Sequence, residues 1–254
     1  MQSDLEVLFT PAEFAALSKR DLHDTVCVVF DVLRATSSMV TALGNGATAI
    51  LPVAEIQEAL TVRQKEPGLL LAGERDGLRI TRKLSGTIDF DFGNSPREFV
   101  AEKVRDRKIV MTTTNGTRAL RACLGAQAIL VSSFLNLRVT ADFLRTQNPA
   151  KILLVCSGTF EEAALEDVLG VGALLDLLDN LVGDRQVADS VLIARDIHGH
   201  AKTDLLKALS KSCNGHRLLS RPELKDDVAF CAQPNAFPFI VTMGKDGWVT
   251  KGTI

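Results

Sequence analysis

Six short apolar runs constrain the fold of this chain more than any other feature of its sequence. Each run contains four or five residues, mostly apolar and not alternating with polar ones. Continuous runs of this length are typical of strands that are covered on both faces, as in a parallel sheet between helices. The sequence therefore predicts buried strands at residues 26–30, 49–53, 68–72, 108–111, 128–132 and 151–155.

Helical patterns lie between these runs, at residues 37–43, 56–63, 117–124, 139–145 and 164–178. Strands and helices that alternate at this spacing indicate an α/β fold. We expect a three-layer α/β/α arrangement with a largely parallel or mixed sheet. No linker rich in proline, serine or glycine divides the chain, so residues 1–254 are predicted to form one compact unit. Two similar halves, at about 1–145 and 146–254, are a further option.

Two of the strand–helix–strand segments resemble each other. Residues 28–53 contain GATAIL at 46–51, and residues 109–132 contain GAQAIL at 125–130. An internal duplication explains this match, and so does a common helix-to-strand turn that is used twice. Both explanations stay open from the sequence.

Composition and charge exclude several partners. The formal net charge is −2, so the chain has no basic excess for binding nucleic acid. No uncharged apolar stretch reaches the roughly 18 residues of a membrane-spanning helix, and no signal-peptide pattern is visible. The five cysteines form no C-x-x-C pair, and their spacing favours a reducing compartment. We therefore expect a cytoplasmic protein without nucleic-acid or membrane partners, and a homodimer remains open.

The first candidate site is the turn after residues 26–30. Asp31 ends the strand, Arg34 follows, and Thr36, Ser37 or Ser38 can cap the next helix. Ligands of α/β sheets bind outside the carboxyl ends of the strands, where helix N-termini attract anions. Asp31 suits a hard cation, and Arg34 suits phosphate or carboxylate. A capped helix with an Asp–Arg surface pair explains the same residues without a function.

A second turn has the same character. Thr112, Thr113, Thr114, Asn115 and Gly116 follow the strand at 108–111 and precede a helix. Their hydroxyl, amide and backbone groups supply many hydrogen bonds, as in a phosphate cradle, although no Walker lysine is present. Redundant helix capping is the alternative.

Two further segments carry candidate polar residues. In the first, Glu74 and Arg75 follow the strand at 68–72, and a turn or helix start follows at 94–96 with Asn94. In the second, Glu166 and Asp167 lie near the start of the helix at 164–178. Acids at a helix start are favoured by the helix dipole, and they are also metal-ligand candidates.

Several catalytic motifs are absent. Asp31 is not followed by the second acid of a D-x-D phosphatase motif, and no cysteine has an arginine six positions later. The G-x-S-x-G serine elbow is also missing. His198 and His200 have no matching ligand cluster, and we interpret them as part of a solvated loop.

Together these segments resemble the 2-phosphosulfolactate phosphatase family. Eight motifs carry the resemblance in the family's order, namely FDVLRATSSMVTAL at 30–43, LAGERDG at 71–77, DFGNSP at 91–96, MTTTNGTRAL at 111–120, SSFLN at 132–136, CSGT at 156–159, LEDVLGVGAL at 165–174 and DDVAFC at 226–231.

The resemblance implies an α/β/α hydrolase that needs Mg²⁺ and removes phosphate from 2-phospho-3-sulfolactate in coenzyme M synthesis. It implies a site at the motif positions Asp31, Arg34, Glu74, Asn94, Thr113, Thr114, Asn115, Glu166, Asp167 and Asp227, to which we add Arg75. We expect Asp31, Glu74 and Asp167 to be metal ligands, and Arg34, Thr114 and Asn115 to hold the phosphoryl group. Water attack on phosphorus is favoured over a phospho-enzyme.

Two other functions stay open. The first is a phosphatase that acts on another small phosphorylated 2-hydroxy acid, and the second is a protein that binds an anion without turnover. For the second acidic group of a substrate, Arg79, Arg82 and Lys83 are candidates, and an ordinary exposed loop is the alternative for them.

Overall fold

A mixed sheet of ten strands organises the chain, in a computed structural model that describes residues 3–183 and 185–252. The strand order is β1-β8-β2-β7-β9-β10-β3-β6-β4-β5. The strands are β1 (Leu5–Leu8), β2 (Thr25–Phe30), β3 (Ala49–Val53), β4 (Leu70–Arg75), β5 (Leu78–Arg79), β6 (Lys108–Thr112), β7 (Ala128–Ser132), β8 (Lys151–Cys156), β9 (Val241–Met243) and β10 (Val249–Lys251).

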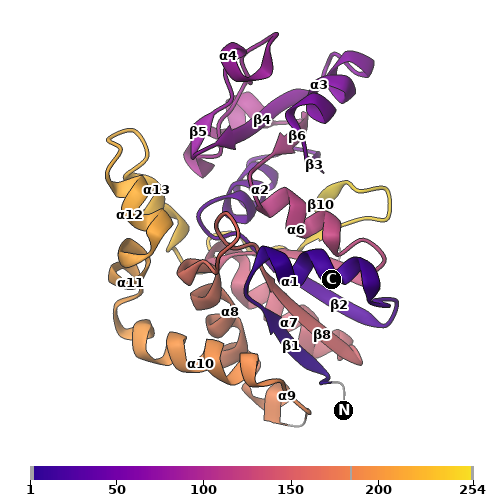
Figure 1. The fold of residues 1–254 in the computed structure, drawn as a ribbon, viewed down its shortest axis with the longest axis vertical. Helices are drawn as coiled ribbons and strands as arrows, with labels where there is room; N and C mark the ends of the chain where they lie inside the picture. Colours follow the sequence, from indigo (N-terminus) through magenta and orange to yellow (C-terminus); the bar gives the residue numbers. More distant parts are fainter. Residues whose placement is uncertain (1–2, 184, 253–254) are drawn as a thin grey trace.

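Helices cover the sheet on both sides (Figure 1). They are α1 (Pro11–Ala15), α2 (Ala35–Gly44), α3 (Ile56–Lys65), α4 (Arg82–Ser85), α5 (Ala101–Val104), α6 (Gly116–Ala122), α7 (Leu137–Gln147), α8 (Leu165–Leu177), α9 (Asp179–Gly183), α10 (Asp189–Ala201), α11 (Leu205–Lys211), α12 (Cys213–Leu219) and α13 (Asp226–Cys231). The predicted α/β/α class with a mixed sheet is confirmed, as are all six predicted strands and all five predicted helices.

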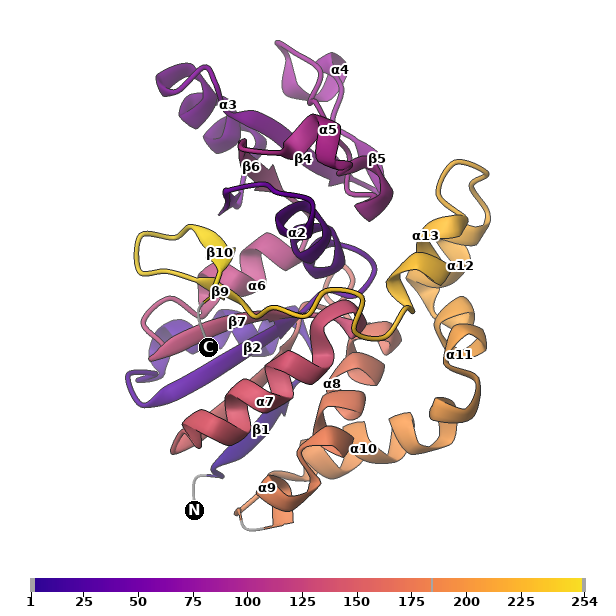
Figure 2. The ribbon, with the colours of Figure 1, turned by 180° about the vertical axis from the view of Figure 1, so that it is seen from behind.

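Two sets of parallel strands make up the sheet, and an antiparallel hairpin joins them. One set is β1, β8, β2 and β7, and the other is β3, β6 and β4. The hairpin β9–β10 pairs with β7 on one side, and with β3 through the single residue pair Val249–Ile50 on the other. Figures 1 and 2 show the two sets at opposite ends of the molecule, with α2 and α6 between them.

The two self-similar segments cross between these sets in opposite directions. The first runs from β2 through α2 to β3, and the second from β6 through α6 to β7. Each starting strand pairs in parallel with the other segment's final strand. Gly46 and Gly125, the first residues of the matching sequences, have φ of +100° and +101°, which glycine tolerates best. A duplication and a shared turn both predict this geometry, so neither is excluded.

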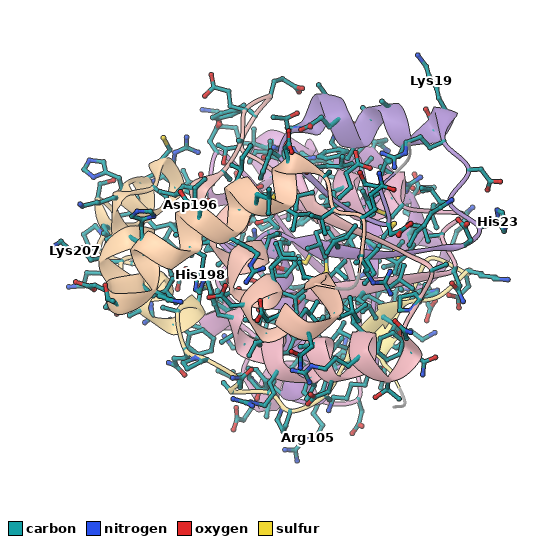
Figure 3. The ribbon with its side chains drawn as sticks, turned by 90° about the horizontal axis from the view of Figure 1, so that it is seen from below. Lys19, His23, Arg105, Asp196, His198 and Lys207 are labelled. Carbon is teal, nitrogen blue, oxygen red and sulfur yellow. The ribbon has the colours of Figure 1, made fainter. Side chains whose placement is uncertain are left out.

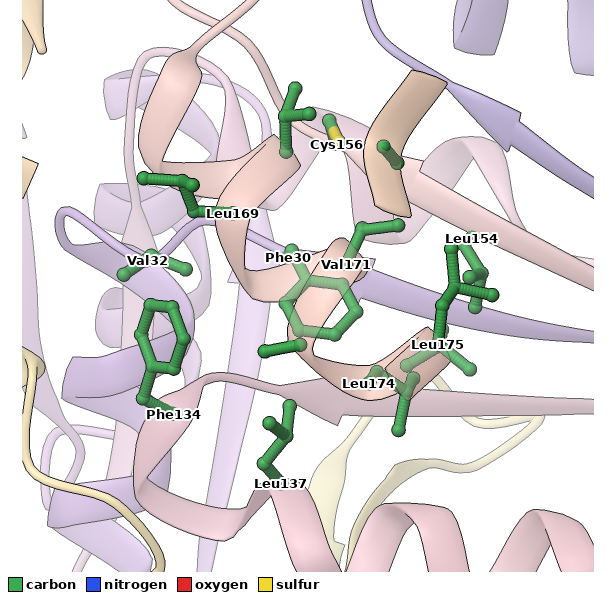
Figure 4. Close-up of a cluster of buried hydrophobic side chains, with 14 of the residues drawn as sticks. Phe30, Val32, Phe134, Leu137, Leu154, Cys156, Leu169, Val171, Leu174 and Leu175 are labelled. Atoms are coloured by element: carbon green, nitrogen blue, oxygen red, sulfur yellow. The ribbon is translucent and has the colours of Figure 1, made fainter. Parts of the chain in front are cut away.

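Alternate side chains of the buried strands enter different cores. Val26, Val28 and Phe30 of β2 pack with α7, α8 and α10 in one apolar cluster (Figure 4). Cys27 and Val29 point into a second cluster, which contains α2, α6 and residues of β3 and β6. A third, smaller cluster lies between α3 and the β3–β6–β4 set. Because both faces of the strands are buried, their sequences are continuously apolar.

The carboxyl-terminal third is the part of the chain whose secondary structure the sequence predicted least. Its helices α10 to α13 follow α8, and α10 packs along α8. The prediction that His198 and His200 lie in a solvated loop is wrong, because both lie on α10, where His198 is buried with Nδ1 3.1 Å from Asp176 Oδ2 (Figure 3). Within residues 3–183 and 185–252, no helix has the length and apolar character to cross a membrane.

Candidate active site

The first residues of α2 and α6 meet beside Asp31. Asp31 directly follows β2, and its Oδ1 accepts a hydrogen bond from the backbone N–H of Ala35 at 3.0 Å. A Cβ at Gly116, which begins α6, would clash with Asp31 Oδ2 and with the Cβ of Ala35. Glycine at position 116 therefore allows α6 to start against this carboxylate.

The helix cap of α2 differs from the predicted one. The hydroxyls of Thr36, Ser37 and Ser38 each donate to a backbone carbonyl, at 2.8 or 2.9 Å, rather than accepting from the first turn. Asp31 supplies the cap instead. The three hydroxyls tie the start of α2 to its surroundings, and all three residues are buried.

A pocket of about 70 Å³ opens at this junction, which is room for a few water-sized groups. Turns after β2, β4, β6 and β8 contribute to it, together with α12. Its lining residues are Asp31, Leu33, Arg34, Glu74, Asp76, Gly77, Asn94, Thr114, Asn115, Gly158, Thr159, Phe160, Asn214, Arg217 and Leu218.

Six of the predicted site residues therefore come together: Asp31, Arg34, Glu74, Asn94, Thr114 and Asn115. The other five, Arg75, Thr113, Glu166, Asp167 and Asp227, are not among the lining residues and instead contact groups around the pocket. Arg75, for example, donates to the Glu74 carbonyl at 2.7 Å, and Thr113 Oγ1 accepts from the Thr117 N–H at 3.2 Å.

Glu74 holds two turns of the pocket in place. Its Oε1 accepts from the N–H and the hydroxyl of Thr114, at 2.8 and 2.9 Å, and its Oε2 accepts from the N–H of Gly77 at 2.7 Å. Asp76 and Gly77, which link β4 to β5, both have positive φ, as a two-residue type I′ hairpin turn requires. Glu74 thus joins this hairpin to the turn after β6.

Asp167 has a similar role on the other side of the pocket. Its Oδ1 accepts from the N–H of Val32 at 2.8 Å, and its Oδ2 accepts from Ser157 Oγ and the Gly158 N–H, both at 3.1 Å. It therefore links the chain after β2 to the chain after β8. All these contacts are buried, so they are expected to fix the turns firmly.

Arg34 is held by a buried ion pair. Its Nη1 lies 2.8 Å from Asp227 Oδ2, and its Nη2 donates to the Gly77 carbonyl at 2.8 Å. Asp227, on α13, also accepts from Ser95 Oγ at 2.7 Å. The guanidinium is 3% exposed and the carboxylate is fully buried, so the loss of either group would leave the other as an uncompensated buried charge.

Three carboxyl groups near the pocket, the half-buried Asp31 and the buried Glu166 and Asp167, have raised pKa values. Burial raises the pKa of Asp31 from its ordinary 3.8 to about 6, and the charges of Glu74 and Glu166 add to this. Burial also raises the pKa of Glu166, and it raises that of Asp167 well above the ordinary value, with the charges of Asp31 and Glu166 contributing. Carboxyl groups with perturbed pKa values that gather at a cleft are typical of functional sites.

Several buried oxygens in this region accept no hydrogen bond from the described residues. They are Asn94 Oδ1, Asn115 Oδ1 and Glu166 Oε2. The orientation of Asn115 is set by its Nδ2, which donates to the Phe160 carbonyl at 3.0 Å. Buried oxygens of this kind are open to a partner from outside the chain, such as a water, a cation or a donor group of a ligand.

The predicted metal ligands differ in how free their oxygens are. The carboxylates of Glu74 and Asp167 each accept three hydrogen bonds, whereas the hydrogen bonds that described residues donate to Asp31 reach only its Oδ1. Within the part of the chain that the structure describes, no three His, Cys, Asp or Glu side chains form a metal-binding group. Mg²⁺ needs fewer, because it binds through one or two carboxylates and keeps several waters. Asp31 with the free amide oxygens of Asn94 and Asn115 fits that requirement.

Comparison with known proteins identifies the family. Residues 12–246 match the family model described as 2-phosphosulpholactate phosphatase. The chain belongs to this family. By that membership it is a phosphoric monoester hydrolase, as the sequence motifs predicted.

Named relatives match along most of their length. A protein of Pseudothermotoga lettingae, named probable 2-phosphosulfolactate phosphatase, is 35% identical over 97% of this chain and 99% of its own. Proteins with the same name from Synechococcus sp. and Caldicellulosiruptor saccharolyticus are 36% and 34% identical, over 89% and 88% of this chain and 91% of each relative. The range matched by the family model, 12–246, spans every residue that lines the pocket.

Sequence reasoning missed the residues that α12 brings to the pocket. Asn214 Nδ2 donates to Thr159 Oγ1 at 2.5 Å and to Glu166 Oε1 at 2.6 Å, and Arg217 lies over the ring of Phe160. The CSGT motif at 156–159 was a signal for Gly158 and Thr159. No comparable motif marked Asn214 or Arg217.

Proposed function

We propose that this protein is a Mg²⁺-dependent phosphatase that hydrolyses 2-phosphosulfolactate to sulfolactate and phosphate, as a step of coenzyme M synthesis in the cytoplasm. Family membership and the names of the relatives support the substrate. The charge of the pocket supports the need for a cation. These two lines of support are independent of each other.

The charge balance of the pocket is the observation that carries the cation requirement. Its lining includes the acids Asp31, Glu74 and Asp76 but only the bases Arg34 and Arg217. A phosphate ester that also bears a carboxylate and a sulfonate carries roughly four negative charges at neutral pH. Such an anion would be repelled by this pocket unless a divalent cation offset the acids. The free oxygens of Asp31, Asn94 and Asn115 are the groups we propose for holding it.

The protein's own residues would then bind and orient the phosphoryl group. Arg34, fixed by Asp227, lines the pocket together with Thr114 and Asn115. Bound Mg²⁺ would neutralise charge on the phosphoryl oxygens. Hydrolysis breaks the ester P–O bond and joins phosphorus to a water oxygen, while a water proton passes to the leaving alcohol. Glu74 and Asp167 are positioning residues in this scheme, because their oxygens already bind the turns.

The test is phosphate release from racemic 2-phosphosulfolactate, with Mg²⁺ or with excess EDTA. Asp31→Asn is compared with wild type and with Asp196→Asn, a control on the exposed side of α10. We expect release that depends on Mg²⁺, is lost in Asp31→Asn and is unchanged in Asp196→Asn. Release that continues in EDTA would contradict the cation requirement.

Other substrates distinguish the alternatives. Release from phospholactate or phosphoglycolate, but not from 2-phosphosulfolactate, would keep the chemistry and reject the coenzyme M substrate. Folded protein that releases phosphate from none of them would favour an anion-binding protein without turnover.

A further inference from the structure

Arg217 is a pocket cation that forms no ion pair with an acid among the described residues, although its charge acts to lower the pKa of the buried Glu166. It lies on α12 and is partly buried at the pocket wall. Arg34, the other arginine of the lining, is held by Asp227 and by the Gly77 carbonyl. Across residues 3–183 and 185–252, no carboxylate lies within 4.0 Å of the Arg217 guanidinium. Arg217 therefore has N–H groups available for an anionic ligand.

Phe160 fixes the position of this guanidinium. The Cζ of Arg217 lies 5.2 Å from the centre of the Phe160 ring, a cation–π arrangement. Phe160 is 51% exposed with φ of +53°, an uncommon conformation for a bulky residue. Its carbonyl accepts a hydrogen bond from Asn115. A stacked guanidinium keeps its edges free, and these edges match a carboxylate or sulfonate.

Phe160 connects Arg217 to the proposed phosphate site, because its carbonyl accepts from Asn115 and its ring lies under Arg217. Asn115 belongs to the turn after β6, next to Thr114, and Phe160 bridges from this turn to Arg217. One small ligand that occupied the pocket would thus meet Arg34 and Thr114, and also Arg217. This arrangement suits a small molecule with more than one acidic group.

The arginines and lysine that the sequence suggested for the second acid lie elsewhere. Arg79, Arg82 and Lys83 are exposed, and none of them lines the pocket. Arg79 lines a neighbouring depression with Glu98 and Glu223. This depression shares Arg34, Gly77 and Asn94 with the pocket, so Arg79 lies beside the pocket but not in it.

We propose that Arg217, stacked on Phe160, binds the second acidic group of the substrate and thereby selects phosphate esters that carry a sulfonate or carboxylate. This inference rests on the proposed phosphatase function and adds the residue that recognises the second acidic group of the substrate. A charge-assisted hydrogen bond of this kind contributes about a 10- to 100-fold preference. The same contact would retain sulfolactate after phosphate has left.

Kinetics with two substrates test this role. Arg217→Gln is assayed with 2-phosphosulfolactate and with ethyl phosphate, which has no second acid. We expect KM for 2-phosphosulfolactate to rise about 10- to 100-fold, with kcat within about threefold, and ethyl phosphate hydrolysis to stay within about threefold. Arg217→Lys should raise KM less than Arg217→Gln does, because lysine keeps the positive charge but lacks the paired N–H groups of the guanidinium. Arg82→Gln is the matched control and should behave as wild type.

Phe160→Leu separates positioning from charge. It removes the ring and keeps the arginine, so we expect a smaller rise in KM, about three- to tenfold, for 2-phosphosulfolactate only. An equal loss with both substrates in Arg217→Gln would overturn the proposal, because Arg217 would then serve the phosphoryl group or the fold. An unchanged KM would overturn it as well.

A titration without turnover keeps this inference distinct from the phosphatase function. Sulfolactate, which has no phosphate, is titrated into wild type and Arg217→Gln by calorimetry in the presence of Mg²⁺. A Kd that rises at least tenfold in Arg217→Gln supports the proposal even if the wild type releases no phosphate. Equal Kd values, or no binding to the wild type, reject it.

Discussion

At the scale of single residues, the carboxylates of this site divide by what their oxygens already contact. Glu74 and Asp167 accept hydrogen bonds on both oxygens and therefore fix backbone turns. Asp31 caps α2 through one oxygen, and the other oxygen faces the junction of α2 and α6. Residue type alone cannot make this distinction, because all three acids follow or end buried strands or begin a helix. It is the local backbone that decides which acid remains free.

Asp31→Asn should make the metal-free protein more stable at pH 8. The pKa of Asp31 is raised by burial from 3.8 to about 6 in the folded chain. Because the folded-state pKa is the higher one, the stability contributed by the protonated group is complete below about pH 4 and is lost as the pH rises through 6. The amide stays neutral and can still cap α2, so it avoids a loss on the order of 3 kcal/mol. Urea unfolding in EDTA at pH 4 and pH 8 measures the difference.

The control for this pH effect is Asp196→Asn, whose carboxylate is exposed. It should follow the wild type at both pH values, and wild type and Asp31→Asn should converge at pH 4. If Asp31→Asn is no more stable than wild type at pH 8, the half-buried carboxylate of Asp31 is compensated within the protein, and the argument for a bound cation is weakened.

Gly116→Ala should damage the site while leaving the fold. The new Cβ would clash with the Asp31 carboxylate and with Ala35, so α2 and α6 would have to separate slightly. Overpacking of this kind costs about 1–3 kcal/mol. We expect a lower urea midpoint and at least a tenfold loss of phosphate release, measured on the same preparation.

Gly199→Ala is the matched control, because among the described residues, apart from its chain neighbours and the backbone of α10 itself, no atom lies within 4 Å of the point that the new Cβ would occupy. Alanine favours a helix, so this protein should be as stable as wild type or more so, with unchanged activity. Normal activity in Gly116→Ala would show that the position of Asp31 tolerates the displacement.

At the scale of elements, α13 completes the site from a distant part of the chain. Its Asp227 is fully buried and pairs with Arg34, the residue directly before α2. Ser95 donates to the same carboxylate. The pair therefore joins the carboxyl-terminal helices to the turn after β2, and its loss should be felt in stability as well as activity.

Asp227→Ala should lower the free energy of unfolding by about 3 kcal/mol or more, because it leaves a buried guanidinium uncompensated. Phosphate release should fall too, since Arg34 loses the partner that positions it. Asp226→Ala is the control, because its side chain is 59% exposed and pairs only at the surface. Urea unfolding of the three proteins gives the comparison, and equal stability of the two variants would contradict this role of Asp227.

The elements differed in how well the sequence predicted them. The six central strands were found because both of their faces are buried, which leaves a continuous apolar run. Strand β4 extends to Arg75, beyond its prediction, because its last residues pair with β5 through the Asp76–Gly77 turn. The edge strand β1 and the hairpin β9–β10 are short, with three or four residues each, and gave no comparable signal.

The site residues were also predicted best where they adjoin buried strands. Polar residues directly after such strands were predicted and do line the pocket, as Asp31, Thr114 and Asn115 illustrate. Asn214 and Arg217 follow no strand, and they reach the pocket only because α12 is placed there by tertiary packing. Sequence patterns report local burial, so contacts of this kind lie outside what they predict.

At the scale of the whole molecule, the two strand sets share one core. The second apolar cluster contains Val29 and Val131 from one set and Ile109 and Met111 from the other, with α2 and α6 between them. The pocket lies where these two helices begin, so its geometry depends on both sets at once. A domain that buries its elements in a common core is expected to unfold as one unit.

The hairpin β9–β10 allows that expectation to be measured, because it carries Trp248, the only tryptophan in a chain without tyrosine. Trp248 packs on the third apolar cluster, and Lys108 Nζ lies 5.2 Å from its ring centre. We expect tryptophan fluorescence and far-ultraviolet circular dichroism to give the same midpoint in urea, since the hairpin joins strand sets that share a core. A fluorescence transition at lower urea would show that the hairpin opens first. Amide exchange at Val249 would then be faster than exchange at Val29, because the single β10–β3 pair would be the weak point of the sheet.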